Sequence, residues 1–342
     1  MTTTTRKAML WEELSDRQVR CHLCQYRCRI QPGKRGVCGV RENADGELIT
    51  LVYGQVSSAA VDPIEKKPLF HFHPGSTVFS LGTLGCNFHC VHCQNWEISF
   101  ADPATTRRDC QYLSPEDAIA TARGRGCRGI AWTYNEPTVW FEYTFDSAVL
   151  AKQAGLYTAY VTNGYMTAEA LDTIGPYLEA YRVDVKGLDG DFYSRIAKVP
   201  SPTGILAVAE RARDRWGMHV EVVTNVIPTV NDDNEQLRAI ARWIREKLGE
   251  MTPWHVTRFH PDHRLREIQA TPLSTLERAH LIGTEVGLKF VYLGNVPGHS
   301  SENTTCYQCG QAVVRRWGYH TELIGLAAGR CASCGAVLGI RE

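Results

Sequence analysis

Short apolar runs alternate with longer amphipathic stretches between residues 76 and 298. Each run is the length of a buried strand, so we expect strands at Thr77–Thr83, Gly129–Thr133, Tyr157–Thr162, Ala180–Val185, His219–Val226, His255–Phe259 and Lys289–Leu293. Asp232–Lys247 and Ser274–Val286 have the periodicity of amphipathic helices, and Ser114 before Pro115 is typical of a helix start. The alternation predicts an α/β domain with a parallel sheet, in which six or seven units close or partly close a barrel. Functional loops then lie at the carboxyl ends of the strands.

The pattern divides the chain into three predicted parts. Residues 1–75 form an N-terminal Cys-containing segment, in which Leu48 to Ala60 alternates like a strand or hairpin. Residues 76–298 form the core domain, and residues 299–342 form a short Gly- and Cys-rich tail.

Composition and charge narrow the class of protein. The 342 residues are 44% hydrophobic and 22% charged, which is ordinary for a soluble globular protein. Lys plus Arg equals Asp plus Glu at 37 each, so no global field favours nucleic acid or an anionic membrane. No apolar run is long enough to cross a bilayer, and the N-terminus lacks the apolar region of a signal peptide. We therefore expect a cytoplasmic protein without a membrane span or a nucleic-acid partner.

Thirteen cysteines are unusual in a chain of this kind, and eleven of them fall in three tight groups. In a reducing compartment, clustered cysteines are typical of metal ligands or redox centres rather than of disulfides. Cys110 and Cys127 stand alone and are expected to be ordinary thiols.

The central group is a loop that directly follows the first predicted strand of the core. Cys86, Cys90 and Cys93 have the spacing Cys-x3-Cys-x2-Cys. Three thiolates can bind three irons of a cubane cluster and leave the fourth iron open. S-adenosylmethionine (SAM) could fill that position through its amino and carboxylate groups. The alternative is a zinc knuckle in which His89 or His92 supplies the fourth ligand.

The other two groups flank the core. The tail group, Cys306, Cys309, Cys331 and Cys334, consists of two Cys-x2-Cys knuckles and predicts a zinc-ribbon-like structure. The tail is too short for an independent apolar core, so a metal would supply its folding energy; an auxiliary iron–sulfur cluster and unmetallated thiols are the alternatives. The N-terminal group is Cys21, Cys24, Cys28 and Cys38. Its spacing suits either zinc or an iron–sulfur cluster, with a slight preference for zinc.

Five strings of residues carry a resemblance to a known family. They are Cys-His-Leu-Cys at 21–24, Arg-Gly-Val-Cys-Gly-Val-Arg-Glu-Asn at 35–43, Cys-Gln-Asn-Trp-Glu-Ile-Ser at 93–99, Tyr-Asn-Glu-Pro-Thr at 134–138 and Gly-Asn-Val-Pro-Gly-His at 294–299. With the three-cysteine loop, they make the chain resemble the AmmeMemoRadiSam-system radical SAM enzymes, which are relatives of the pyruvate formate-lyase activating enzymes. The resemblance implies a partial (βα)6 TIM-like barrel, a [4Fe–4S] cluster and SAM as a cofactor.

The resemblance also implies which residues contact SAM. Tyr-Asn-Glu-Pro looks like the segment that meets the SAM amino group, and Thr-Asn-Gly at 162–164 looks like a segment of the activases, which usually have Asp where Val161 stands. Asp-x-Lys at 184–186 matches a motif of the activases, although a plain ion pair at the strand end is the alternative. The cofactor-binding residues expected on these grounds are Asn135, Glu136, Thr162, Asn163, Asp184, Lys186 and His260.

The expected activity is reductive cleavage of SAM to a 5′-deoxyadenosyl radical, which abstracts a hydrogen atom, as in the activation of a glycyl radical enzyme. Radical modification or C–C bond formation on a small molecule or lipid is an alternative. A non-enzymatic electron-transfer or binding module with iron–sulfur and zinc sites is another. The resemblance implies a one-electron donor of the flavodoxin or ferredoxin type, and Memo-like and AMME-type proteins as partners, but does not fix a substrate.

Overall fold

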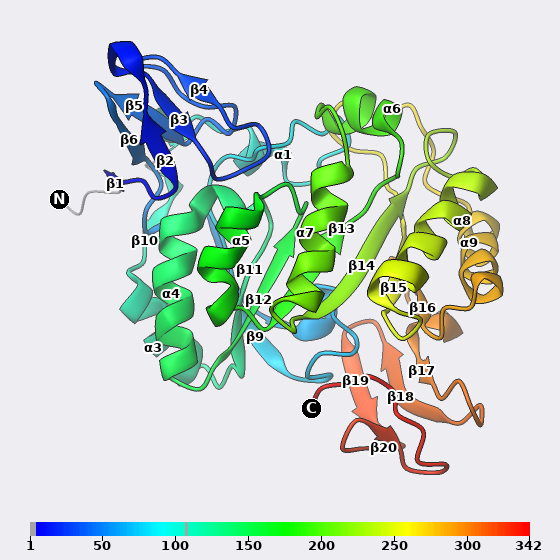
Figure 1. The fold of residues 1–342 in the computed structure, drawn as a ribbon. Helices are drawn as coiled ribbons and strands as arrows, with labels where there is room; N and C mark the ends of the chain where they lie inside the picture. Colours follow the sequence, from blue (N-terminus) through cyan, green and yellow to red (C-terminus); the bar gives the residue numbers. More distant parts are fainter. Residues whose placement is uncertain (1–4, 107–108) are drawn as a thin grey trace.

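A single open sheet of eight strands forms the centre of the molecule in the computed structural model, which describes residues 5–106 and 109–342 (Figure 1). The strand order is β16-β15-β14-β13-β12-β11-β9-β8. Seven strands are parallel, and β8 runs antiparallel to β9. The strands are β8 (Ser58–Pro63), β9 (Thr77–Gly82), β11 (Gly129–Trp132), β12 (Tyr157–Thr162), β13 (Ala180–Asp184), β14 (His219–Val226), β15 (Trp254–Arg258) and β16 (Val291–Gly294). All seven predicted core strands are therefore present.

The sheet has one parallel strand more than the six implied by the resemblance. The extra strand is β16, which pairs with β15 from Trp254↔Val291 to Thr257↔Gly294. Within the described residues, β8 and β16 are the two edges and do not pair with each other. The sheet is thus not a closed barrel, and its classification as a partial barrel stays a prediction.

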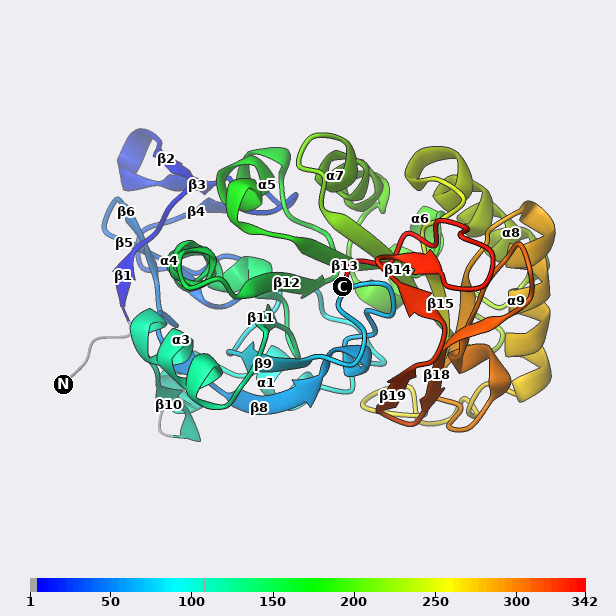
Figure 2. The ribbon, with the colours of Figure 1, turned by 90° about the horizontal axis from the view of Figure 1, so that it is seen from below.

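Amphipathic helices cover the outer side of this sheet (Figures 1 and 2). They are α3 (Pro115–Gly124), α4 (Phe141–Gln153), α5 (Ala168–Ile174), α7 (Thr203–Asp214), α8 (Asn234–Trp243) and α9 (Leu273–Val286). Ser114 caps α3 as predicted, because its side chain accepts a hydrogen bond from the Asp117 amide. Asp233 caps α8 in the same way. No helix of the described residues is both long and apolar enough to cross a membrane.

Short helices lie in the loops at the carboxyl ends of the strands. They are α1 (Trp96–Ser99), α2 (Pro103–Thr106) and α6 (Gly190–Phe192). On the outer side, α9 packs tightly on the sheet because Gly283 has no side chain. A Cβ atom at Gly283 would lie 2.8 Å from Val291 and 3.0 Å from the Trp254 ring.

The N-terminal segment forms two small antiparallel sheets beside the carboxyl end of β12. One sheet contains β1 (Arg6–Lys7), β6 (Glu47–Thr50) and β5 (Arg41–Ala44), and the other contains β2 (Trp11–Glu13), β3 (Val19–Cys21) and β4 (Arg29–Ile30). A bridge between Cys24 and Met166 attaches the segment to the core.

The predicted strand or hairpin at Leu48–Ala60 is correct only in part, because its residues join three different sheets. Strand β6 pairs with β5 and β1, and β8 pairs with β9. Between them, β7 (Gln55–Val56) pairs with β10 (Gln111–Tyr112). A turn in which the Gln55 amide bonds to the Val52 carbonyl separates β6 from β7, and long-range partners then determine the pairing.

The tail lies at the opposite end of the sheet from the N-terminal segment (Figure 1). It contains β17 (Thr304–Thr305), β18 (Ala312–Trp317), β19 (His320–Leu323), β20 (Leu326–Ala327) and β21 (Arg330–Cys331). Its apolar residues do not form a separate core. They join residues of the main domain in one buried cluster that includes Phe70, Phe290, Tyr292, Val313, Val314 and Leu338.

Candidate cluster and cofactor site

A cavity of about 530 Å³ opens at the carboxyl ends of β9, β11, β12 and β13. The structure brings most of the predicted site residues to its wall: Cys86, Cys90, Cys93, Asn135, Glu136, Thr162, Asn163, Asp184 and Lys186. They come from four successive parallel strands, whose carboxyl ends share one edge of the sheet. The structure therefore brings these residues together, and the contact of each with a cofactor stays a prediction.

The three-cysteine loop leaves β9 through Gly85, which has a positive φ of +82°. A side chain there is excluded, because a Cβ atom would lie 2.4 Å from Val40 and 2.7 Å from the Cys38 carbonyl oxygen. Backbone hydrogen bonds from Val91 to the Ile196 carbonyl and from Gly85 to the Ile98 carbonyl hold the loop. The loop is thus held at its start and near its third cysteine, and its three thiols line the cavity.

The three thiols suit a multi-iron cluster better than a single zinc ion. Tetrahedral zinc with bonds of about 2.3 Å holds its sulfur ligands roughly 3.8 Å apart. In the described parts of the chain, only the tail cysteines form a group of three or more metal-ligand atoms within 4.8 Å of one another. The ligand atoms of the loop do not form such a group. This holds for Cys86, Cys90 and Cys93 alone and also when His89 or His92 is added. A cubane cluster separates its thiolates in this way because each one binds a different iron.

The two histidines of the loop have different surroundings. His92 lines the cavity, and burial lowers its pKa to about 3. Its Nδ1 atom is buried without a hydrogen-bond partner. His89 stacks on Phe100 instead, with ring centroids 5.4 Å apart, and does not line the cavity.

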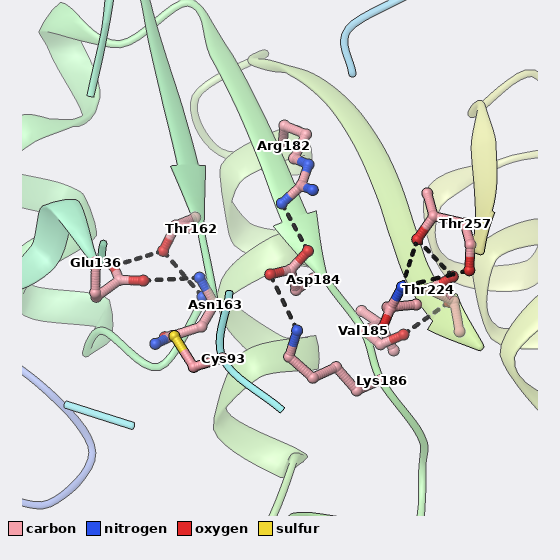
Figure 3. Close-up of polar contacts among 12 residues, drawn as sticks. Cys93, Glu136, Thr162, Asn163, Arg182, Asp184, Val185, Lys186, Thr224 and Thr257 are labelled. Atoms are coloured by element: carbon pink, nitrogen blue, oxygen red, sulfur yellow. Dashed lines mark hydrogen bonds and ion pairs between the residues drawn. The ribbon is translucent and has the colours of Figure 1, made fainter. Parts of the chain in front are cut away.

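Glu136, which follows β11, is buried and surrounded by hydrogen-bond donors (Figure 3). Its Oε1 accepts hydrogen bonds from the Thr138 amide at 3.0 Å, the Thr138 hydroxyl at 2.5 Å and the Thr162 hydroxyl at 2.7 Å. Its Oε2 accepts one from the Asn163 amide at 2.7 Å. Burial raises the pKa of Glu136, while these donors favour the carboxylate. The group is therefore held as an acceptor that suits an ammonium ligand.

Asp184 lies between two cations at the end of β13 (Figure 3). It accepts from Arg182 Nη1 at 2.6 Å and from Lys186 Nζ at 3.2 Å. Burial opposes its ionisation, but the two cations prevail and lower the pKa of Asp184. Burial likewise opposes the charge of Lys186, yet Asp184 and Cys90 keep its pKa raised. The group carries a net positive charge that suits a carboxylate ligand or an anionic cluster.

Sequence reasoning did not single out Arg182, although its signal was present. Arg182, Asp184 and Lys186 alternate along β13, and alternation with period two places all three on one face of a strand. A third charge in that pattern indicates that the face meets a polar cavity.

Two asparagines connect the strand ends to the cysteine loop. The side-chain nitrogen of Asn163, Nδ2, donates to Asn87 Oδ1 at 2.8 Å and lies 3.9 Å from Cys86 Sγ. Asn135 donates to the Gly85 carbonyl at 2.7 Å and accepts from the Thr83 amide at 3.1 Å. Asn135, predicted to bind the cofactor, thus uses its side chain to position the loop.

His260 is the one predicted cofactor-binding residue that lies apart from the cavity. It is exposed and absent from the wall, which His255, Thr257 and Phe259 line instead. These three residues alternate with period two along β15, so the next residue points away from the cavity. The structure therefore does not support His260 as a cofactor-binding residue.

The tail cysteines form a compact group of a different kind. The Sγ atoms of Cys306 and Cys334 are 3.6 Å apart, and those of Cys309 and Cys331 are 3.7 Å apart. All four lie within 4.8 Å of one another and could hold a single metal ion.

Comparisons with known proteins place this geometry in a family. Residues 81–244 match the Radical SAM superfamily. An uncharacterized protein of Methanocaldococcus jannaschii is 42% identical over 337 residues, which cover 98% of this chain and 99% of that protein. The pyruvate formate-lyase-activating enzyme of Clostridium pasteurianum is 25% identical over 203 residues, covering 54% of this chain and 81% of the enzyme.

Two further comparisons concern part of the chain and its fold. The isethionate sulfite-lyase activating enzyme of Oleidesulfovibrio alaskensis is 32% identical over 158 residues, which cover 44% of this chain and 50% of that enzyme. The structure of Streptococcus suis SuiB bound to S-adenosylmethionine superposes with a TM-score of 0.50 at 13% identity, covering 71% of this chain and 56% of SuiB, and indicates a shared fold only. The chain therefore contains a domain of the Radical SAM superfamily, whose members use a [4Fe–4S] cluster and SAM.

Proposed function

We propose that this chain reductively cleaves SAM at a [4Fe–4S] cluster held by Cys86, Cys90 and Cys93. When bound, this cofactor pair supplies a 5′-deoxyadenosyl radical that abstracts a hydrogen atom. The observation that carries the proposal is the position of the three thiols on a cavity that also contains a buried carboxylate and an ion-paired lysine. SAM would occupy the open iron through its amine and its carboxylate, and these two side chains are complementary to those groups.

In this proposal, different residues of the cavity contact different groups of SAM. Glu136 accepts a hydrogen bond from the SAM amino group, and Lys186 donates to the SAM carboxylate. Thr162 and Asn163 hold Glu136 in place through the hydrogen bonds described above. Gly318 and Tyr319 of the tail also form part of the cavity wall.

For the substrate, we propose hydrogen abstraction from a glycine of a partner protein. The support is the similarity to the two activating enzymes, each of which covers about half of this chain. We further propose membership in the AmmeMemoRadiSam system, with Memo-like and AMME-type proteins as partners and a flavodoxin- or ferredoxin-type protein as electron donor. The strings at 21–24, 35–43 and 294–299 support it.

At the tail, we propose a structural zinc ion on Cys306, Cys309, Cys331 and Cys334. The sulfur separations of 3.6 and 3.7 Å support it, since tetrahedral zinc requires roughly 3.8 Å. A closed site with four thiolates leaves no open position for catalysis.

Anaerobic incubation of the reconstituted chain with SAM and dithionite tests the activity. We expect 5′-deoxyadenosine and methionine as products, and no 5′-deoxyadenosine from the Cys86→Ala variant. An electron-transfer module that does not act on SAM would yield none from either protein. Addition of candidate partner proteins, followed by EPR, then tests the substrate class. A carbon-centred radical on a partner supports the activase proposal, whereas transfer of deuterium from a labelled metabolite into 5′-deoxyadenosine contradicts it.

A further inference from the structure

The N-terminal cysteines form a closed cage that the proposed function does not use. Cys21, Cys24, Cys28 and Cys38 surround one small space, whose wall is completed by Leu23, Ile30, Gly36, Arg41 and Val139. The space has a volume of about 10 Å³, close to the room of one water-sized sphere. Four thiols therefore converge on one enclosed and mainly apolar site.

The width of this cage distinguishes it from the tail site. A water-sized sphere cannot fit between four sulfurs that lie about 2.3 Å from a common centre, as in a zinc site. Among the residues that the structure describes, the cage cysteines do not form a group of metal-ligand atoms within 4.8 Å of one another, whereas the tail cysteines do. In this respect the cage resembles the Cys86 loop. The spacing points to a multi-iron cluster.

A buried arginine contacts one of the cage cysteines. Arg41 is 1% exposed, and its Nη1 lies 3.2 Å from Cys21 Sγ. Its Nη2 donates to the Met9 carbonyl at 2.9 Å and forms an ion pair with the buried Glu142. Its Nε is buried without a hydrogen-bond partner. The buried guanidinium therefore places a positive charge next to a cage sulfur, where it favours an anionic thiolate or cluster.

The cage also lies next to the three-cysteine loop. The Cys38 carbonyl oxygen would be 2.7 Å from a Cβ atom at Gly85, the residue before Cys86. On the other side, the Gln25 amide donates to the Tyr165 carbonyl at 3.0 Å. The Tyr165 ring lies 5.4 Å from the Tyr26 ring and 5.3 Å from the Phe88 ring. Three aromatic rings thus connect the residues beside Cys24 with those beside Cys86.

We propose that Cys21, Cys24, Cys28 and Cys38 bind a second [4Fe–4S] cluster, which is fully ligated by protein and relays single electrons to the cluster of the Cys86 loop. The relay takes up one electron from a reduced carrier of the flavodoxin or ferredoxin class and passes one electron on. That electron is consumed when the carbon–sulfur bond of SAM breaks. The relay role rests on the proposed function, whereas the presence of the cluster does not.

Metal analysis of the full chain after anaerobic reconstitution with iron and sulfide tests the site. We expect about eight irons per chain in the wild type and about four in a Cys24→Ala/Cys38→Ala variant, with zinc unchanged. A Cys86→Ala/Cys90→Ala/Cys93→Ala variant should also keep about four irons. Cys127→Ala serves as the control, because this buried cysteine belongs to none of the three groups and its loss should leave the iron content unchanged.

Two outcomes would overturn the proposal. One is loss of about one zinc, with iron unchanged, in the Cys24→Ala/Cys38→Ala variant. The other is absence of iron from the triple variant, which decides the matter even if the cage variant fails to fold. EPR of the dithionite-reduced wild type should show magnetic coupling between two neighbouring clusters, and each variant should show one uncoupled signal.

The relay role is tested separately from the site. With a reduced flavodoxin-type carrier in place of dithionite, the cage variant should form 5′-deoxyadenosine at least tenfold more slowly than Cys127→Ala. Equal rates would contradict the relay. If the wild type forms no 5′-deoxyadenosine with any reductant, the proposed function fails, yet the iron content still decides whether the cage holds a cluster.

Discussion

Substitution of Glu136 by glutamine tests the proposed SAM contact most directly. The carboxylate receives hydrogen bonds from three donors at Oε1 and one at Oε2, and all four neighbours donate. A glutamine that keeps its oxygen at the Oε1 position must place its NH2 group against the Asn163 amide. The opposite orientation would place it against the Thr138 amide. Glu136→Gln therefore removes the negative charge and leaves at least one buried donor without an acceptor.

The size of the effect follows from these contacts. A hydrogen bond to a charged group contributes about 1.5–3 kcal/mol and a neutral one about 0.5–1.5 kcal/mol. Loss of the charge should thus weaken SAM binding by about 1–2 kcal/mol, roughly 5- to 30-fold in Kd. The unsatisfied Asn163 amide should lower the free energy of unfolding by an additional 1–3 kcal/mol or so.

Anaerobic titration calorimetry on the reconstituted protein measures the change in SAM affinity, and thermal unfolding measures the change in stability. SAM should bind more weakly to Glu136→Gln, while 5′-methylthioadenosine, which lacks the amino-acid group, should bind as it does to the wild type. Glu169→Gln is a matched control, since its side chain is 52% exposed and pairs only with Arg27 at the surface. An unchanged Kd for SAM, or an equal loss for both ligands, would show that Glu136 does not contact the SAM amino group.

Four more substitutions give distinct expected outcomes. Cys90→Ala should lose the visible absorption of the central cluster and all SAM cleavage, and normal cleavage would refute its assignment as a ligand. Lys186→Ala should keep that cluster but weaken SAM binding by about 1–3 kcal/mol, and an unchanged affinity would leave only an ion-pair role. Cys309→Ser should lose about one zinc and expose the tail to limited proteolysis, whereas loss of iron instead would point to a cluster. Glu221→Ala should lower the free energy of unfolding by about 3–5 kcal/mol, because Glu221 is fully buried and accepts from His255 at 2.6 Å; a thermal midpoint as high as that of exposed Glu285→Ala would contradict this.

The sequence was most informative where local pattern and burial agree. The strand predicted at His219–Val226 has the same bounds in the structure, because a run of buried residues with β-branched side chains leaves little alternative. The site residues at 136, 163 and 184 could be placed together because parallel strands share one carboxyl edge.

Features that depend on distant partners could not be predicted in this way. The residues between Leu48 and Ala60 alternate as a strand does, but only the tertiary structure determines that they pair with three different sheets. The spacing of the N-terminal cysteines gave only a slight preference for zinc over an iron–sulfur cluster, since the arrangement of the four thiols around one space appears only in the tertiary structure. His260 lies outside the cavity wall, because His255, Thr257 and Phe259 alternate on the wall and the residue after Phe259 points the other way.

The shared core of the tail means that residues 299–342 are not a detachable appendage. Arg316 donates to the Phe70 carbonyl at 2.8 Å, and its guanidinium lies 4.1 Å from the centre of the Phe70 ring. A backbone bridge pairs Phe72 with Arg341 near the very end of the chain. Truncation before the tail would uncover Phe70, Phe290 and Tyr292 and open one end of the cavity. Unfolding of the tail and of the main sheet should consequently be cooperative, so that the zinc ion proposed for the four tail cysteines would stabilise the whole molecule and not the tail alone.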